Sequence, residues 1–305
     1  MFIIFVLNYS VLAAEDQGSS GLNVEHYYSI TPKILENGTQ NDISFGFFHT
    51  QDLKFGSEIK LRTIKTSELG EIWEIPDSMS TGEYDAYEVF LLPVNYQFIK
   101  NDYFSLRAGV GTYYNYNKSK TRGYFNDKNL FEEVTPDHYN SYNYDFTGHA
   151  VGPILDLETS LRWKFLYFSF SGGVVPVSYF YNEMSLRLSP LMTPPEFSVS
   201  GESASGPYYY LNLDFAVNFL KYFTLFVTLF NEFSRLKFNS IEFDDNGRWT
   251  SIDTTEDYNT FALEISLLVN LGSGSFMPLI GYGRTFDEET GGKNYFMLGV
   301  KKILY

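Results

Sequence analysis

The chain has 305 residues, no cysteine and a formal net charge of −15. The acidic balance argues against nucleic-acid binding, which needs a basic surface, and the lack of cysteine excludes thiol catalysis, a thiolate metal site and a lipid anchor on cysteine. Aromatic residues make up 19% of the chain, yet beyond the N-terminus no segment reaches the ~18 unbroken apolar residues of a membrane helix. This combination fits a membrane barrel, in which apolar residues alternate with polar ones.

The first residues predict a secretory signal. Residues 1–14 have an apolar core and end in small residues before Glu15 and Asp16, although the usual basic start is missing. We therefore divide the chain into a signal peptide (1–14), a polar linker (15–21) and one transmembrane barrel domain (22–305). The alternative is that residues 1–14 form a buried strand.

Three strands are expected in the first part of the barrel domain, at 22–31, 42–50 and 53–65, with an Asn-Gly turn at residues 36–38. The third places Lys54, Glu58, Lys60 and Arg62 on one face. A charge on the lipid side would cost ~2–4 kcal/mol at the membrane midplane. This face is therefore predicted to line the lumen.

The next strand, 84–99, contains Pro93, which cannot donate to a ladder and predicts a bulge. A register shift there would put Glu88 before it, and Asn95 and Gln97 after it, on the same inner face. Strand 103–115 then alternates cleanly, with Arg107 facing inward.

Residues 116–145 are long, polar and rich in tyrosine, and we expect them to form the largest loop. Strand 146–163 follows, with Asp156, Glu158 and Arg162 facing inward. Strand 165–181 begins almost at once, and a loop rich in proline and serine is expected at 182–206.

Residues 208–233 carry the clearest pattern, two runs of strict alternation joined by almost no turn. Each run exceeds the ~9–11 residues that a tilted membrane strand needs. Asp214 and Glu232 lie on the polar faces. After a loop at 239–257, strands are expected at 258–270, with Glu264 inside, at 276–286 and at 294–305.

The connections alternate between short and long ones, as in barrels with tight periplasmic turns and longer outer loops. The count of twelve is even, so both termini belong on the periplasmic side. The predicted fold is all-β, a closed antiparallel transmembrane β-barrel of about 12 strands.

The whole mature chain resembles bacterial outer-membrane β-barrel proteins, in the general porin-like class and in no specific subfamily. The resemblance rests on the cleavable start, on strand–turn–strand units such as YQFIKNDYFSLRAGVG and FLKYFTLFV, and on the terminal aromatic Tyr305. It implies location in the bacterial outer membrane, contact with outer-membrane lipids and lipopolysaccharide, and recognition of the C-terminal strand by the barrel-assembly machinery. Lys301 departs from the pattern, because it shares parity with Ile303 and Tyr305.

The charged inner face has two readings. Opposed charges could line a narrow passive channel for small polar or ionic solutes, which the inward Gly109 and Gly111 favour. They could also pair across a plugged lumen and leave a closed structural barrel whose extracellular loops bind partners. The predicted lumen-lining residues are Lys54, Glu58, Lys60, Arg62, Glu88, Arg107, Asp156, Glu158, Arg162, Asp214, Glu232 and Glu264.

We expect no enzyme, no catalytic residues, no cofactor and no metal site. An outer-membrane hydrolase is the weakest alternative, and it would use His149 with Asp145 near the outer rim. Residues 242–253 loosely follow calcium-loop spacing, but Asp-Asn-Gly at 245–247 is equally a hairpin turn, and we take it as one.

Overall fold

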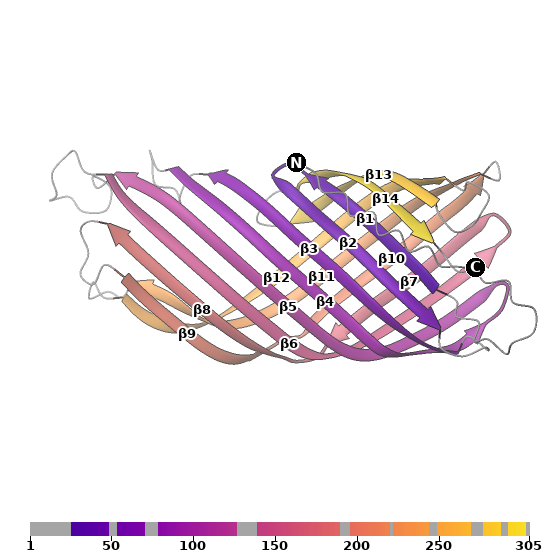
Figure 1. Ribbon diagram of the computed structural model, residues 1–305, viewed down its shortest axis with the longest axis horizontal. Coiled ribbons are helices and arrows are strands. Elements are labelled where there is room, and N and C mark those ends of the chain that lie inside the picture. Colours follow the sequence, from indigo (N-terminus) through magenta and orange to yellow (C-terminus); the bar gives the residue numbers. More distant parts are fainter. Residues whose placement is uncertain are drawn as a thin grey trace, which may run out of the picture.

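The computed structural model describes residues 26–48, 54–70, 79–126, 139–189, 196–219, 222–243, 249–269, 277–287 and 292–302. These residues form one elongated barrel of steeply tilted strands (Figure 1). The predicted signal peptide, the linker and the first residues of the predicted first strand lie outside the described residues. So do the closing residues 303–305.

Fourteen strands carry labels in Figure 1. They are β1 (His26–Leu35), β2 (Gly38–Phe48), β3 (Phe55–Gly70), β4 (Met79–Lys100), β5 (Phe104–Asn126), β6 (Tyr139–Trp163), β7 (Leu166–Val175), β8 (Ser178–Ser189), β9 (Glu196–Ser205), β10 (Tyr208–Phe219), β11 (Phe223–Phe243), β12 (Trp249–Val269), β13 (Met277–Asp287) and β14 (Asn294–Lys302).

The strands close into a ring. The hydrogen-bonded order is β5-β4-β3-β2-β1-β14-β13-β12-β11-β10-β7-β6-β8-β9, and an additional β5–β6 ladder joins the two sides. β7 continues into β8 after a two-residue break, and β9 continues into β10 in the same way, so each pair is one strand of the wall. The prediction of an all-β, closed, antiparallel barrel with 12 strands is confirmed.

The two-residue alternation decides which side chains face out. In the β10–β11 hairpin, Phe215 pairs with Val227 and is exposed, whereas the neighbouring Ala216 and Phe226 are buried inside. The hairpin predicted at residues 208–233 therefore forms with its two faces as expected.

The predicted bulge at Pro93 is confirmed. The β4–β5 register shifts between Leu91 and Val94, and Glu88, Asn95 and Gln97 are all buried on the inner side. If β4 alternated strictly through Pro93 without a bulge, Asn95 and Gln97 would face outward while Glu88 faced the lumen.

Three predicted loops are largely wrong. Of residues 116–145, β5 takes those up to Asn126 and β6 those from Tyr139, so only the middle remains a connection. Residues 182–206 are mostly β8 and β9, and residues 239–257 are mostly β11 and β12. These segments alternate between apolar and polar far less clearly, because their outer faces are polar as well.

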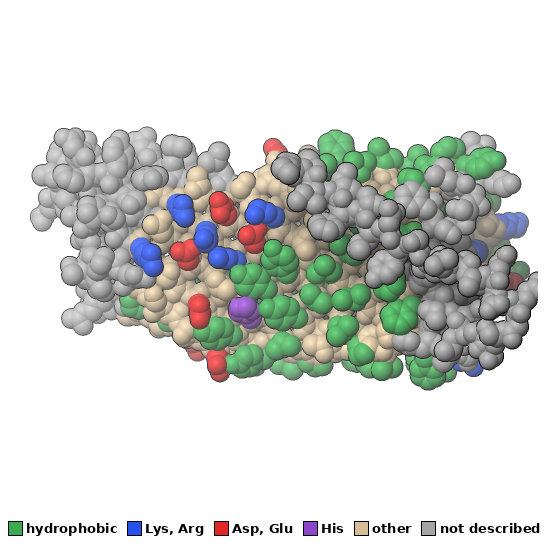
Figure 2. Space-filling model, in the orientation of Figure 1, with side chains coloured by type: hydrophobic (Ala, Val, Ile, Leu, Met, Phe, Trp, Pro, Cys, Tyr) green, Lys and Arg blue, Asp and Glu red, His purple; other side chains and the backbone are tan. Residues whose placement is uncertain are grey.

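The short connections, the start of β1 and the end of β14 share one end of the barrel, which we call the turn end (Figure 1). The loop end is opposite, where β8 and β9 meet (Figure 1). Large apolar side chains such as Phe98, Leu155 and Trp163 are exposed around the barrel. They cover the face in Figure 2 toward the turn end, and charged side chains gather toward the loop end. No helix among the described residues is long and apolar enough to cross a membrane.

Candidate functional site in the lumen

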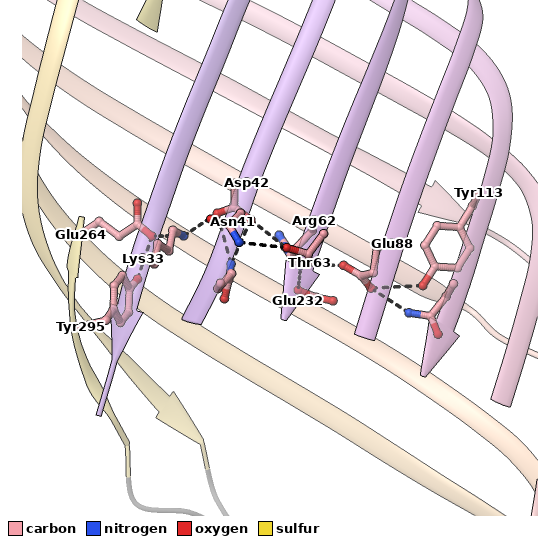
Figure 3. Close-up of polar contacts among 12 residues, drawn as sticks. Lys33, Asn41, Asp42, Arg62, Thr63, Glu88, Tyr113, Glu232, Glu264 and Tyr295 are labelled. Atoms are coloured by element: carbon pink, nitrogen blue, oxygen red, sulfur yellow. Dashed lines mark hydrogen bonds and ion pairs between the residues drawn. The ribbon is translucent and has the colours of Figure 1, made fainter. Parts of the chain in front are cut away.

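A belt of paired charges crosses the lumen (Figure 3), and Arg62, Glu88 and Glu232 within it lie near the middle of their strands. We call it the charged belt, and its members are Lys33, Asp42, Arg62, Glu88, Glu232 and Glu264. β1, β2, β3, β4, β11 and β12 each contribute one of these residues. Each comes from an inward-facing position of its strand.

Arg62 is the centre of the charged belt. Its guanidinium Nη1 lies 2.6 Å from Glu232 and 3.0 Å from Glu88, and its Nε lies 3.2 Å from Asp42. In the ring order β3-β2-β1-β14-β13-β12-β11, Arg62 and Glu232 stand on opposite walls. A direct contact between opposite walls leaves no open passage along that line.

Lys33 joins the belt to the β12 wall. Its ammonium lies 2.8 Å from Asp42 and 2.6 Å from Glu264, and the Tyr295 hydroxyl donates to Glu264 at 2.7 Å. The Lys33 and Glu264 side chains are only 12% and 15% exposed. Breaking such a buried pair by removing one partner typically costs 3–5 kcal/mol.

A second layer of polar contacts involves neighbouring inward positions of β3. Lys60 lies 2.9 Å from Asp156 and donates to the Tyr210 hydroxyl at 3.1 Å. Arg107 hydrogen-bonds Glu158 and lies 3.5 Å from Glu58. The lumen is thus braced by more than one set of pairs.

Aromatic side chains fill the lumen beside the belt. The Phe90 ring lies 5.3 Å from that of Tyr210, and Tyr113 stacks on Tyr208 at 4.8 Å. The same buried cluster continues toward the loop end, where it includes Phe180, Met184 and Phe238. We call it the apolar plug.

Toward the turn end the lumen is open and polar. A cavity of about 860 Å³ extends from the belt to the β4–β5 turn. Its walls carry hydroxyls and charges, for example Ser169 and Thr228, whose hydroxyls hydrogen-bond Asp214 at 2.9 and 2.6 Å. A polar solute could therefore enter this half of the lumen from the turn end.

The structure places the predicted lumen residues as follows. The residues that line the cavity are Glu58, Lys60, Arg62, Arg107, Glu158, Arg162, Asp214 and Glu264. Glu88 and Glu232 lie inside as members of the charged belt, and Asp156 lies inside in the second layer. Lys54 lies one residue before β3, is exposed, and is not among the residues that line the cavity.

Several site residues escaped the sequence reasoning. Lys33 lies beyond the predicted end of its strand, because β1 runs past Pro32 to Leu35. The predicted second strand starts at Asp42, whereas β2 begins at Gly38. The hydroxyls of Tyr210 and Tyr295 also bind lumen carboxylates. Continuing the two-residue parity through both ends of the Asn37 turn would have found the two charged residues.

The histidine of the hydrolase alternative lies on the outer surface. The flanking Gly148 and Ala150 are buried inside, and the Tyr114 hydroxyl lies 3.0 Å from His149 Nδ1. His149 also lies against the Tyr116 ring, at 5.0 Å between centroids. It therefore belongs to a band of aromatic rings on the barrel exterior.

Among the described residues, no group of three or more histidine, aspartate or glutamate side chains is arranged to hold a metal ion. The centre of the loosely calcium-like segment, residues 244–248, lies outside the described residues, as does His138.

Comparison with known proteins returns structures only. No family model matches the chain, and no curated protein matches it. The translocator domain of the autotransporter NalP from Neisseria meningitidis has 12% identity and a TM-score of 0.47, covering 95% of this chain and 90% of that one. The outer-membrane protease OmpT from Escherichia coli has 10% identity and a TM-score of 0.48, covering 95% and 99%.

The KdgM porin has 11% identity and a TM-score of 0.36, covering 92% of this chain and all of that one. The fold is that of an outer-membrane β-barrel. The strand pairing itself carries this statement. Similarities of this size do not bear on activity, and the three proteins named have three different activities.

Proposed function

We propose that this chain is a bacterial outer-membrane barrel whose lumen is closed at mid-height and which acts through its extracellular part. The exposed apolar side chains supply the lipid-facing surface. The turn end, where β1 begins and β14 ends, faces the periplasm. Contact with outer-membrane lipids and lipopolysaccharide, and recognition of the C-terminal strand by the assembly machinery, belong to the same proposal.

The contact between Arg62 and Glu232 carries the closed-barrel reading. These side chains come from opposite walls and meet at 2.6 Å, and the apolar plug fills the lumen beside the charged belt and from there toward the loop end. A barrel of 8 strands is filled by side chains and one of 16–18 leaves a channel, so 12 strands permit either state. Here side chains occupy the middle.

The extracellular part is large enough to present a surface. β3, β4, β11 and β12 continue past the apolar exterior into a region where outward side chains are charged, as in the pairs Lys65–Asp85 and Arg235–Asp257. The strands at this end form a hydrogen-bonded, water-exposed wall, and the connecting loops start from it. Such loops are suited to contact molecules outside the cell.

Single-channel recording in planar bilayers tests this proposal. The wild-type barrel should give no discrete conductance steps, because ions cannot pass the charged belt and the apolar plug. A known porin inserted under the same conditions serves as the positive control. Stable, reproducible steps from the wild-type protein would contradict the closed state.

A narrow passive channel for small polar or ionic solutes is the second candidate, and the 860 Å³ polar cavity favours it. In that case Arg107 and Arg162 would act on passing ions. Replacing both by glutamine should then move the reversal potential toward cation selectivity. An unchanged reversal potential would remove these residues from the permeation path.

A further inference from the structure

The β8–β9 hairpin is attached to the rest of the wall along one edge only. β8 pairs with β6 from Ser141 to Val151, and β9 pairs with β8 along its length. The other edge of β9 faces residues 235–243 of β11, but no backbone ladder between the two strands is present among the described residues. We call this boundary the seam.

Side chains bridge the seam in place of a ladder. Lys237 N donates to Ser205 Oγ at 2.8 Å. The Asn182 side chain reaches from β8 to β11, donating to Asn239 O at 2.9 Å and accepting from Asn239 N at 3.3 Å. Gly201 lies opposite Asn182, and a Cβ there would come within 2.4 Å of Asn239 Cγ. These few contacts replace a continuous row of interstrand hydrogen bonds.

A line of glycine and proline crosses the base of the hairpin. It consists of Gly152–Pro153 in β6, Pro176–Val177 between β7 and β8, and Gly206–Pro207 between β9 and β10. A Cβ on Gly152 would lie 2.5 Å from Val177 O, and one on Gly206 would lie 3.0 Å from Pro176 O, so the three dipeptides are adjacent. Proline has no N–H to donate, which weakens the sheet along this line.

We propose that the β8–β9 hairpin is a flap that opens at the seam. It swings outward along the β6–β8 ladder, which stays paired, and the glycine–proline line lets β8 and β9 bend away from β7 and β10 at the base of the hairpin. Opening connects the interior of the loop end with the outside through the barrel wall, without passage through the charged belt. Phe180 and Met184 on the hairpin and Phe238 of β11 belong to the apolar plug, and packing within this cluster favours the closed position.

Hydrogen exchange of single amides in β11 tests the flap, with the protein held in a lipid bilayer. The backbone N–H groups of Lys237 and Asn239 donate across the seam. Because N–H groups along a strand point alternately to its two neighbours, those of Leu236 and Phe238 point to the other side, toward β12. Transient opening should make the Lys237 and Asn239 amides exchange at least about tenfold faster than the Leu236 and Phe238 amides. Equal protection of both sets would overturn the proposal.

A disulfide across the seam provides the second arm, and the natural chain has no cysteine to interfere. The variant Gly201→Cys/Asn239→Cys should, when oxidised, slow exchange at Lys237 to the rate of Leu236. The matched control, Asn239→Cys/Asp253→Cys, keeps the same β11 residue but joins it to its ladder partner on β12. This control disulfide should leave hydrogen exchange at the Lys237 amide fast. A seam disulfide that does not slow Lys237 would contradict the flap, whether or not the lumen conducts.

Discussion

Arg62 concentrates much of the lumen's electrostatic stability in one side chain. It contacts three carboxylates, those of Asp42, Glu88 and Glu232, and its side chain is 18% exposed. Without the guanidinium these carboxylates would face one another in a confined space. Like charges there repel more strongly than in water because the surrounding protein screens them poorly.

Replacing Arg62 with methionine should lower the free energy of unfolding by about 3–5 kcal/mol, the range for a buried pair that loses one partner. Urea titration of the barrel in detergent, followed by tryptophan fluorescence, measures the change.

The control is Arg235→Met, which removes an exposed partner of Asp257 on the outer surface. Arg235 donates two hydrogen bonds to this carboxylate, which lowers the pKa of Asp257. Water screens an exposed pair of this kind, so the midpoint should hardly move. Equal losses in the two variants would show that the position of Arg62 inside the lumen has no special weight.

Parity along each strand was sufficient to assign the inner face, but it did not reveal the pairing. Arg62 and Glu232 are 170 positions apart in the chain. They meet only because the ring closes with β3 opposite β11. Whether the lumen is open or closed by side-chain pairs depends on strand tilt and on which side chains are long enough to meet across the ring. Local alternation in the sequence predicts neither.

At the scale of whole strands, the main errors concern length. Sequence reasoning ended β5 near residue 115 and started β12 near residue 258, whereas the ladders continue to Asn126 and begin at Trp249. Where the outer face is apolar, the alternation between apolar and polar residues is clear. Past it, Lys118 and Lys120 of β5 occupy outward positions, so polar residues fall on both parities and resemble a loop.

The hairpin between β8 and β9 depends on the apolar plug. Phe180 is fully buried within it, so Phe180→Ala should cost about 3–5 kcal/mol in unfolding free energy. The loss should appear first at the loop end, as faster protease cleavage within residues 178–205. The membrane-embedded strands should stay protected.

Tyr179→Ala is the matched control. Tyr179 is the next residue on the same strand, faces outward and is 49% exposed. Its removal opens no space inside the barrel. Cleavage rates that rise equally in both variants would argue against a packed interior at the loop end.

For the molecule as a whole, the outer surface determines whether the protein is soluble in water or needs detergent or lipid. Apolar side chains such as Phe45, Leu155 and Phe215 are exposed on strands around the whole ring. A soluble monomer rarely exposes a continuous apolar patch above ~600 Å².

The purified protein should therefore be monodisperse only in detergent or lipid and should aggregate when these are removed. Size-exclusion chromatography with light scattering measures this. A stable monomer in plain buffer would refute the membrane assignment.

The positions of apolar and charged side chains, inside or outside the wall, reverse along the barrel axis. Toward the turn end, oil-compatible side chains point outward and charges point inward. Toward the loop end, the salt pairs Lys65–Asp85 and Lys237–Asp253 point outward, and phenylalanines fill the interior. If the barrel sat deeper in the membrane, these charged side chains would enter the hydrocarbon region. Each Lys or Arg that reached the midplane would cost ~2–4 kcal/mol of free energy. The boundary between apolar and charged outward side chains therefore fixes how deeply the barrel sits in the membrane.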